Sequence, residues 1–225
     1  MNGTLYILST PIGNLKDITL RALEVLKLVD LVAAEDTRHT KKLLDHFEIQ
    51  KELFSYYEDV EQAKLPVLIS HLQQGKNVAL VSDAGTPLIS DPGFRLVREA
   101  AALGILIVPI PGPNAALSAL SVSGLPTDRF EFFGFLPEKP GKRKKLLESL
   151  AVSDHTLVFY VSPYKFVKTI GEMLGIFGDR SCCLARELTK MHEEIWRGPL
   201  STLLVKWTSQ VPKGEITLVI AGASS

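Results

Sequence analysis

Cysteine is scarce in this chain. Its 225 residues include only Cys182 and Cys183, which are adjacent in sequence and are not expected to bridge each other. No spaced set of Cys and His residues has the pattern of a zinc site, so we expect no metal and a reduced, cytoplasmic setting. No apolar run approaches the roughly 20 residues of a membrane span, which excludes an obvious membrane anchor.

Two common nucleotide-binding signatures are also missing. The chain has no Gly-x-Gly-x-x-Gly, which excludes an ordinary dinucleotide fingerprint, and no Gly-Lys-Ser/Thr, which argues against a nucleoside triphosphatase loop. An excess of either charge is absent too, because 25 Lys and Arg offset 25 Asp and Glu. Bulk charge therefore predicts no polyanionic partner, although a local basic face is compatible with this balance. The first residues do not resemble a signal peptide.

Short apolar strands alternate with amphipathic helices instead. In the first half this alternation predicts a parallel sheet covered on both faces, with Asp17 as the cap of the first helix. In the second half, weaker alternation predicts a mixed sheet. The expected strands lie over residues 5–9, 31–34, 78–81 and 105–110, with another near 54, and then over 130–136, 157–161, 182–188 and 215–220. The expected helices lie over residues 17–28, 60–74, 94–103, 115–122, 164–174 and 199–208, and another follows the motif at 35–38 and ends near 47.

Three of the expected strands end in loops rich in Pro and Gly, over residues 9–15, 82–93 and 111–115. Ligands of α/β proteins bind at the carboxyl ends of strands. Small residues let the backbone approach a ligand, and Asp and Ser supply hydrogen-bond partners. One such loop alone is typical of an ordinary turn. Three together, one of them with two Asp residues, favour a composite site.

The motifs at residues 10–15, 35–38, 82–87, 90–93 and 111–115 resemble those of the tetrapyrrole methylase superfamily. The resemblance runs from about residue 5 to about residue 221. Glu35-Asp-Thr-Arg38 and the unbroken block 82–93 are similar to the branch that acts on ribosomal RNA. That branch uses S-adenosylmethionine to methylate a cytidine ribose 2′-hydroxyl in 16S rRNA of the small ribosomal subunit.

The resemblance implies two α/β domains with the cofactor in the cleft between them. Residues 1–112 would form the domain on the substrate side and residues 113–225 the rest of the pocket and the dimer contacts. It also implies a homodimer whose partner is 16S rRNA, within the 30S particle. Two alternatives stay open: a methylase of the same fold for a small molecule such as a tetrapyrrole precursor, and a catalytically silent RNA-binding assembly factor.

By resemblance, S-adenosyl-L-methionine is held by the three loops. Block 82–89 would form the main wall, with backbone groups facing the methionine and ribose portions and the Thr86 hydroxyl added. No metal is required, because the cofactor carries the reactive group. The expected cofactor-binding residues are Pro11, Gly13, Ser82, Asp83, Ala84, Gly85, Thr86, Pro87, Ile89, Pro111, Gly112, Pro113, Asn114 and Ala115.

Methyl transfer to a hydroxyl also needs a proton acceptor. A carboxylate near the positive sulfonium is a weak base, which disfavours Asp83 and favours Asp36 on the substrate side. Arg38 would position Asp36 or an RNA phosphate, although the two also fit a structural ion pair. Asp91 fits best as the cap of a helix beginning near Pro92.

A rival catalytic pair lies in the second domain. By resemblance, Lys190 would meet a phosphate or activate the nucleophile, and Glu187 would orient it. A surface ion pair of little energetic value is an equal alternative for Lys190.

One basic cluster, Lys142, Arg143, Lys144 and Lys145, is the candidate RNA contact. A basic run at a helix start opposes the helix dipole, so it has little local structural benefit. A solvated face explains the run equally well. Members of this branch commonly continue into a basic helical extension. This chain ends at Ser225, so we expect either a natural short form or a shortened one.

Overall fold

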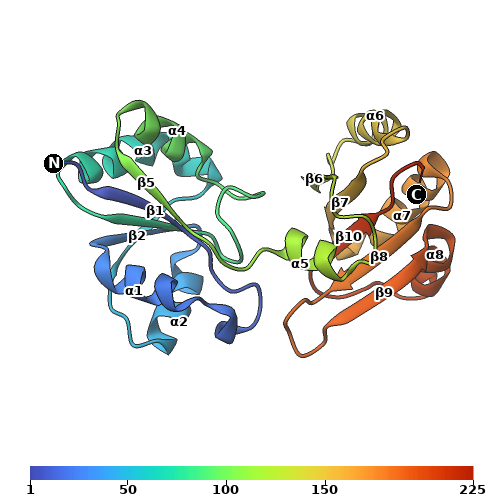
Figure 1. The fold of residues 1–225 in the computed structure, drawn as a ribbon, viewed down its shortest axis with the longest axis horizontal. Coiled ribbons are helices and arrows are strands. Elements are labelled where there is room, and N and C mark those ends of the chain that lie inside the picture. Colours follow the sequence, from blue (N-terminus) through green and yellow to red (C-terminus); the bar gives the residue numbers. More distant parts are fainter. Residues whose placement is uncertain (225) are drawn as a thin grey trace. The chain divides into compact units, whose positions relative to one another are not determined.

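The computed structural model describes residues 1–224. They divide into two compact units, residues 1–114 and residues 115–224 (Figure 1). The division expected from the sequence lies two residues earlier, after Gly112. Each unit contains its own five-stranded sheet. Among residues 1–224, no helix has the length and apolar character needed to cross a bilayer, and no group of His, Cys, Asp or Glu could hold a metal ion. Both cysteines are buried and free.

Unit 1 is built on a parallel sheet, as the sequence predicts. The strands lie side by side in the order β3-β2-β4-β1-β5. Every neighbouring pair in this sheet is parallel. The strands are β1 (Thr4–Leu8), β2 (Leu31–Ala34), β3 (Glu52–Ser55), β4 (Val78–Val81) and β5 (Leu106–Ile110).

Helices cover both faces of this sheet (Figure 1). Side chains of β4 alternate between them: Val78 and Leu80 pack with α3 and α4, whereas Ala79 and Val81 pack with α1 and α2. All four β4 residues are at most 2% exposed, because a sheet covered on both faces buries both sets of side chains. The helices are α1 (Leu20–Leu28), α2 (Thr37–His46), α3 (Glu58–Gln73) and α4 (Phe94–Ala102).

Two of the expected helix caps are wrong. Asp17 lies in a 3₁₀ turn, η1 (Leu15–Asp17), and the cap of α1 is Thr19, whose Oγ1 accepts the Ala22 N–H at 3.0 Å. Asp91 does not cap α4, because the helix begins two residues after Pro92 and its N-cap is Gly93. Gly93 has φ of +128°, a backbone conformation that diverts the chain before the helix can start.

Unit 2 has the mixed sheet predicted from the sequence, in the order β6-β7-β10-β8-β9. β6 and β7 are parallel, and the other neighbouring pairs are antiparallel. The edge strand β9 was not expected, because none of its residues is fully buried and no clear alternation marks it. The strands are β6 (Phe130–Phe135), β7 (Thr156–Val161), β8 (Ser181–Arg186), β9 (Glu194–Pro199) and β10 (Ile216–Ile220).

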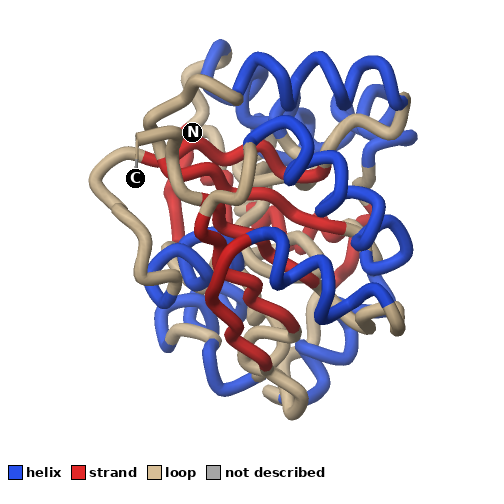
Figure 2. Tube along the Cα trace, turned by 90° about the vertical axis from the view of Figure 1, so that its right-hand side faces the viewer, coloured by secondary structure: helices blue, strands red, loops and turns tan. Residues whose placement is uncertain are grey.

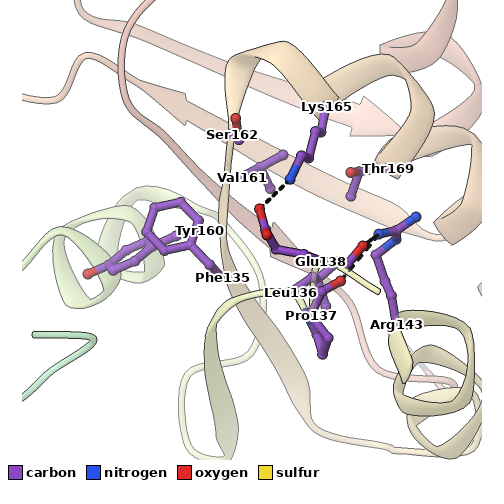
Figure 3. Close-up of a pocket in the computed structure, with 10 residues that line it drawn as sticks. All are labelled: Phe135, Leu136, Pro137, Glu138, Arg143, Tyr160, Val161, Ser162, Lys165 and Thr169. Atoms are coloured by element: carbon purple, nitrogen blue, oxygen red, sulfur yellow. Dashed lines mark hydrogen bonds and ion pairs between the residues drawn. The ribbon is translucent and has the colours of Figure 1, made fainter. Parts of the chain in front are cut away.

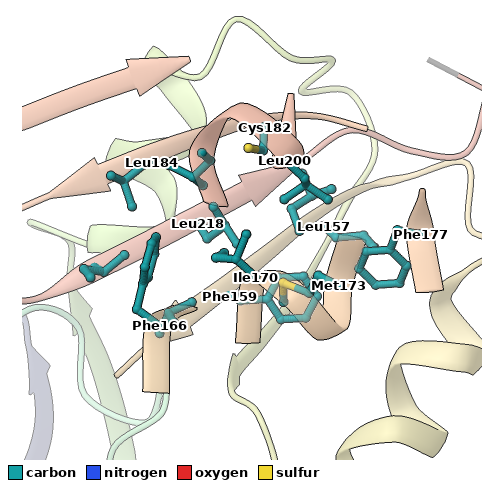
Figure 4. Close-up of a cluster of buried hydrophobic side chains, with 14 of the residues drawn as sticks. Leu157, Phe159, Phe166, Ile170, Met173, Phe177, Cys182, Leu184, Leu200 and Leu218 are labelled. Atoms are coloured by element: carbon teal, nitrogen blue, oxygen red, sulfur yellow. The ribbon is translucent and has the colours of Figure 1, made fainter. Parts of the chain in front are cut away.

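Helices α6, α7 and α8 cover one face of this second sheet, and α5 covers the other. Phe159, Leu184 and Leu218 point into a large apolar core beneath α6, α7 and α8, shown in Figure 4. Val158, Cys183 and Val219 pack beneath α5. Figure 2 shows how helices flank the strands. The helices are α5 (Ala115–Val122), α6 (Pro140–Leu150), α7 (Phe166–Phe177) and α8 (Leu200–Thr208), with a 3₁₀ turn η2 (Pro163–Lys165) before α7.

Candidate active site

The strand order of unit 1 brings its loops together. β2, β4, β1 and β5 are consecutive in the sheet and run in the same direction. Their carboxyl ends therefore share one edge, where α/β proteins bind ligands. The loops that leave these four ends begin at Glu35, Ser82, Ser9 and Pro111. They are the motifs that the sequence singled out.

The β1 and β4 loops are joined through their backbones. The Thr10 N–H donates to the Gly85 carbonyl at 2.8 Å, and the Gly85 N–H donates to the Thr10 carbonyl at 3.1 Å. The Thr10 hydroxyl also donates to the Ser82 carbonyl at 3.1 Å. Thr10 and Ser82 are each 3% exposed, so these bonds form away from solvent. The two loops thus form one framework.

The β5 loop joins the same framework through Thr86. Its hydroxyl accepts a hydrogen bond from the Ser9 hydroxyl at 3.1 Å and donates to the Pro113 carbonyl at 3.0 Å. Gly112 lies so close to Ser9 that a Cβ added there would sit 2.9 Å from the Ser9 Cβ. The Thr86 side chain is therefore engaged in holding loops together, whereas the sequence suggested that it adds a hydroxyl to the ligand.

The expected cofactor residues differ in accessibility. Gly13, Ala84, Ile89, Pro111 and Gly112 are exposed. Thr86, Pro113, Asn114 and Ala115 are half-buried, and so is Asp83. Pro11, Ser82, Gly85 and Pro87 are buried and support the loops from within. The exposed small residues leave backbone surface open to a ligand.

The β4 loop contains unusual backbone conformations. Leu88 and Ser90 have φ of +72° and +69°, and Gly85 and Gly93 have φ of +86° and +128°. Positive φ is uncommon for residues other than glycine and persists only where surrounding contacts impose it. The loop is therefore held in shape by its anchors.

Asp36 is engaged in a structural role. Its carboxylate accepts the Arg38 backbone N–H at 2.8 Å, capping α2, and pairs with the Arg38 guanidinium through two further bonds of 3.1 and 2.8 Å. These hydrogen bonds hold the pKa of Asp36 far below its usual range. Such a carboxylate is a weak base, which argues against the proton acceptor expected from the sequence.

Asp91 and Glu35 have raised pKa values, in contrast to Asp36. Burial raises the pKa of Asp91 to about 6, against a hydrogen bond from Ser82, and the charge of Asp83 adds to the rise. Burial and the charges of Asp91 and Asp83 also raise the pKa of Glu35. Asp83 itself accepts the Asp36 N–H at 2.9 Å, which ties the β4 loop to the β2 loop. Glu35 was not a sequence candidate, although it stands beside Asp36 in the same motif.

In unit 2, Glu187 and Lys190 contact each other as expected. The Lys190 Nζ lies 2.9 Å from Glu187 Oε1 and 3.0 Å from Glu215 Oε2. Burial raises the pKa of Glu187, but the Glu215 N–H and Lys190 outweigh it, so the net pKa is lowered. Burial lowers the pKa of Lys190, but its two carboxylate partners raise it overall. The pair is thus poorly suited to accept a proton.

Arg143 does not face solvent with the rest of the basic run. It is 6% exposed, and its guanidinium pairs with Glu172 at 2.6 and 2.8 Å. It also donates to the carbonyls of Pro137 and Glu138 (Figure 3). Arg143 therefore belongs to the packing of unit 2 and closes one side of a pocket of about 180 Å³ at the ends of β6 and β7. Lys142, Lys144 and Lys145 are exposed.

Comparisons with known proteins agree with this geometry. Residues 4–204 match the family model of the tetrapyrrole (corrin/porphyrin) methylases. A ribosomal RNA small subunit methyltransferase I from Synechocystis is 50% identical over 99% of this chain and 80% of its own length. One of the same name from Escherichia coli O157:H7 is 51% identical over 98% of this chain and 78% of its own length.

Solved structures share the fold at lower identity. The methyltransferase CobJ superposes with a TM-score of 0.73 at 19% identity, covering 98% of this chain and 95% of that one. A uroporphyrin-III C-methyltransferase from Thermus thermophilus, complexed with S-adenosylhomocysteine, superposes with a TM-score of 0.67 at 20% identity, covering 96% and 97%. The predicted fold, the methyltransferase activity and the use of S-adenosylmethionine are confirmed. The chain belongs to the tetrapyrrole methylase family and, within it, to the ribosomal RNA small subunit methyltransferase I proteins.

Proposed function

We propose that this protein transfers a methyl group from S-adenosylmethionine to the 2′-hydroxyl of a cytidine ribose in 16S rRNA. The relatives, at about half identity over nearly the whole chain, are named for the RNA of the small ribosomal subunit. Their names favour this substrate over a tetrapyrrole precursor. The interlocked loops of unit 1 favour an enzyme over a silent assembly factor. The loops after β1, β2, β4 and β5 form a glycine-rich edge of the sheet, the ligand edge, whose shape these hydrogen bonds maintain.

The loops of unit 1 suit the cofactor. Exposed small residues, Gly13, Ala84 and Gly112, allow close approach of a ligand to the backbone. When bound, the cofactor supplies an electrophilic methyl on a positively charged sulfur. The carboxylate of Asp83 would complement that charge. Burial, together with neighbouring carboxylates, raises the pKa values of Glu35 and Asp91.

For the proton acceptor we propose Asp91 in place of Asp36. A base whose pKa lies nearer neutrality transfers protons more effectively, and general-base catalysis contributes roughly 10²–10⁴-fold. Asp91 has a pKa of about 6, whereas Arg38 keeps that of Asp36 far lower. Asp36 and Arg38 would then shape the β2 loop. Glu187 and Lys190 would orient substrate, as their mutual pairing holds both side chains in place.

The exposed lysines of α6 are proposed to contact rRNA phosphates. Lys142, Lys144 and Lys145 lie on one helix and are exposed, although Lys144 also lies 3.7 Å from Glu148. Such contacts predict binding that weakens steeply with salt. The assembled 30S particle as substrate, the homodimer and the cytoplasmic location stay predictions from the resemblance.

The decisive experiment offers purified protein and methyl-labelled cofactor three substrates. These are 30S particles from a strain lacking the gene, naked 16S rRNA and uroporphyrinogen III. We expect label on a cytidine ribose in the ribosomal RNA, located by mass spectrometry of nuclease fragments. Label on a base would contradict the proposed position, and label only in the tetrapyrrole would contradict the proposed substrate.

A further inference from the structure

Glu61 is a buried carboxylate that lies outside every motif of the site. It is on α3 and is 7% exposed. Its Oε1 accepts the Tyr56 hydroxyl at 3.1 Å, the Gly93 N–H at 3.2 Å and the Arg95 N–H at 3.3 Å. Its Oε2 lies 3.7 Å from the Arg95 Nε. A buried charge is costly unless it is paired in this way, so these contacts define where α4 begins relative to α3.

These contacts make Glu61 the cap of α4. The first N–H groups of a helix need acceptors, and the residue at the N-cap normally provides one from its side chain. Gly93 occupies the N-cap of α4 and has no side chain. Glu61, 32 residues earlier, accepts the N–H of Gly93 and that of Arg95 instead. Its negative charge also complements the helix dipole.

The cap sits at the end of the strained β4 loop. The other end of that loop is held at Gly85 by the two backbone bonds to Thr10. Between these anchors lie Leu88 and Ser90, both with positive φ. A larger residue does not fit at Gly93 without a shift of its neighbours, because an added Cβ would lie 2.6 Å from Leu80 Cδ2. Conformations of this kind persist only when their surroundings impose them.

We propose that Glu61 is a positioning residue for the cofactor loop. By holding the amide groups at the start of α4, it fixes the loop end that carries Asp91 and keeps residues 86–93 in the ligand-binding conformation. It touches neither cofactor nor substrate and acts through loop geometry alone. The inference rests on the proposed function only in taking this loop as the cofactor wall.

Two substitutions at Glu61 and one control test this role. Glu61→Ala removes every contact, whereas Glu61→Gln keeps a side-chain oxygen for the α4 amides and loses the charge. Tyr56→Phe removes a buried hydrogen bond to the same carboxylate without touching α4. Affinity for S-adenosylhomocysteine is measured by calorimetry on samples that circular dichroism shows to be folded. Hydrogen exchange of residues 86–93 is followed in parallel.

We expect Glu61→Ala to weaken S-adenosylhomocysteine binding about fivefold, which corresponds to the loss of about 1 kcal/mol typical of a removed helix cap. Glu61→Gln should recover part of that loss, and Tyr56→Phe should bind like the parent even if its stability falls. In assays, KM for S-adenosylmethionine should rise. At saturating cofactor kcat should stay near the parental value, because bound cofactor selects the loop conformation that Glu61 otherwise holds. Faster exchange should be concentrated in residues 86–93 in Glu61→Ala.

Other outcomes overturn the inference. Parental affinity and exchange in folded Glu61→Ala would show that the loop holds its shape without Glu61. If Glu61→Ala does not fold, parental affinity in Glu61→Gln together with weakened binding in Tyr56→Phe would attribute the effect to general stability. The proposed function fails separately, when the parent protein does not methylate rRNA. In that case hydrogen exchange still decides what Glu61 does to the loop.

Discussion

Thr10 and Gly85 lie on different loops, 75 positions apart, and exchange two backbone hydrogen bonds of 2.8 and 3.1 Å. This isolated antiparallel bridge lies beyond the ends of β1 and β4, which pair with each other in parallel. It explains why the β4 loop returns toward the sheet before it reaches α4. The ligand edge of unit 1 is consequently a continuous backbone surface, and its shape depends on Gly85.

Gly85→Ala should therefore weaken cofactor binding. Gly85 has φ of +86°, and an added Cβ would lie 3.3 Å from Ile12 Cγ2. A left-handed conformation costs other residues roughly 1–2 kcal/mol, which chemical denaturation would detect. Gly104→Ala is the matched control, because Gly104 has φ of +66° with nothing within 4 Å of the added atom. We expect both variants to lose stability and only Gly85→Ala to lose affinity in calorimetry. Equal affinities in the two variants would contradict the placement of the pocket.

Asp91 should make stability depend on pH. Its pKa is about 6 in the folded protein, whereas an unperturbed aspartate has a pKa of 3.8. The folded state therefore holds the proton more tightly, and the contribution of this group to stability is full below about pH 4 and is lost as pH rises through about 6. Asp91→Asn should be more stable than the parent at pH 7–8, by roughly 1–2 kcal/mol after allowance for partial exposure. Urea denaturation across pH measures this, and a constant difference at all pH values would refute it.

Single-turnover rates should separate the candidate bases. At saturating 30S particle and cofactor, we expect Asp91→Asn to slow methyl transfer by roughly 10²–10⁴-fold. Asp36→Asn should slow it far less, because Arg38 already suppresses the basicity of Asp36. Glu187→Gln reports on the unit 2 pair, and we expect its effect to lie mainly in substrate binding. A near-parental rate for Asp91→Asn with a large loss in Asp36→Asn would identify Asp36 as the proton acceptor.

Substitutions in the basic run of α6 should divide into two classes. Lys142→Glu with Lys145→Glu should weaken binding to 30S particles and reduce its salt dependence, with cofactor affinity unchanged. Arg143→Gln should instead destabilise unit 2, by about 3 kcal/mol, because it leaves the Glu172 carboxylate without its buried partner. Binding across a salt series and thermal denaturation distinguish the two. A stable Arg143→Gln protein with weakened RNA binding would show that Arg143 contacts RNA and does not support the packing of unit 2.

Local patterns in the sequence were sufficient to locate the ligand edge. The central strands β2 and β4 are buried on both faces and appear in the sequence as short apolar runs. The loops at the ligand edge need Gly, Pro and Asp for their backbone geometry. Both signals lie within a few consecutive residues. The same holds for the contact between Glu187 and Lys190, which are three positions apart.

The tertiary structure decided the pKa values of the candidate carboxylates, the pairing of Arg143 and the position of the edge strand β9. Asp36 and Asp91 look alike in sequence, but Arg38 lowers the pKa of one whereas burial and Asp83 raise that of the other. In the sequence, Arg143 belongs to a basic run, but in the folded chain it pairs with Glu172 of α7, 29 positions away. Strand β9 pairs at the edge of its sheet without a buried face to mark it. A pKa or an ion pair depends on which distant residues are brought within a few ångströms, and only the folded chain determines that.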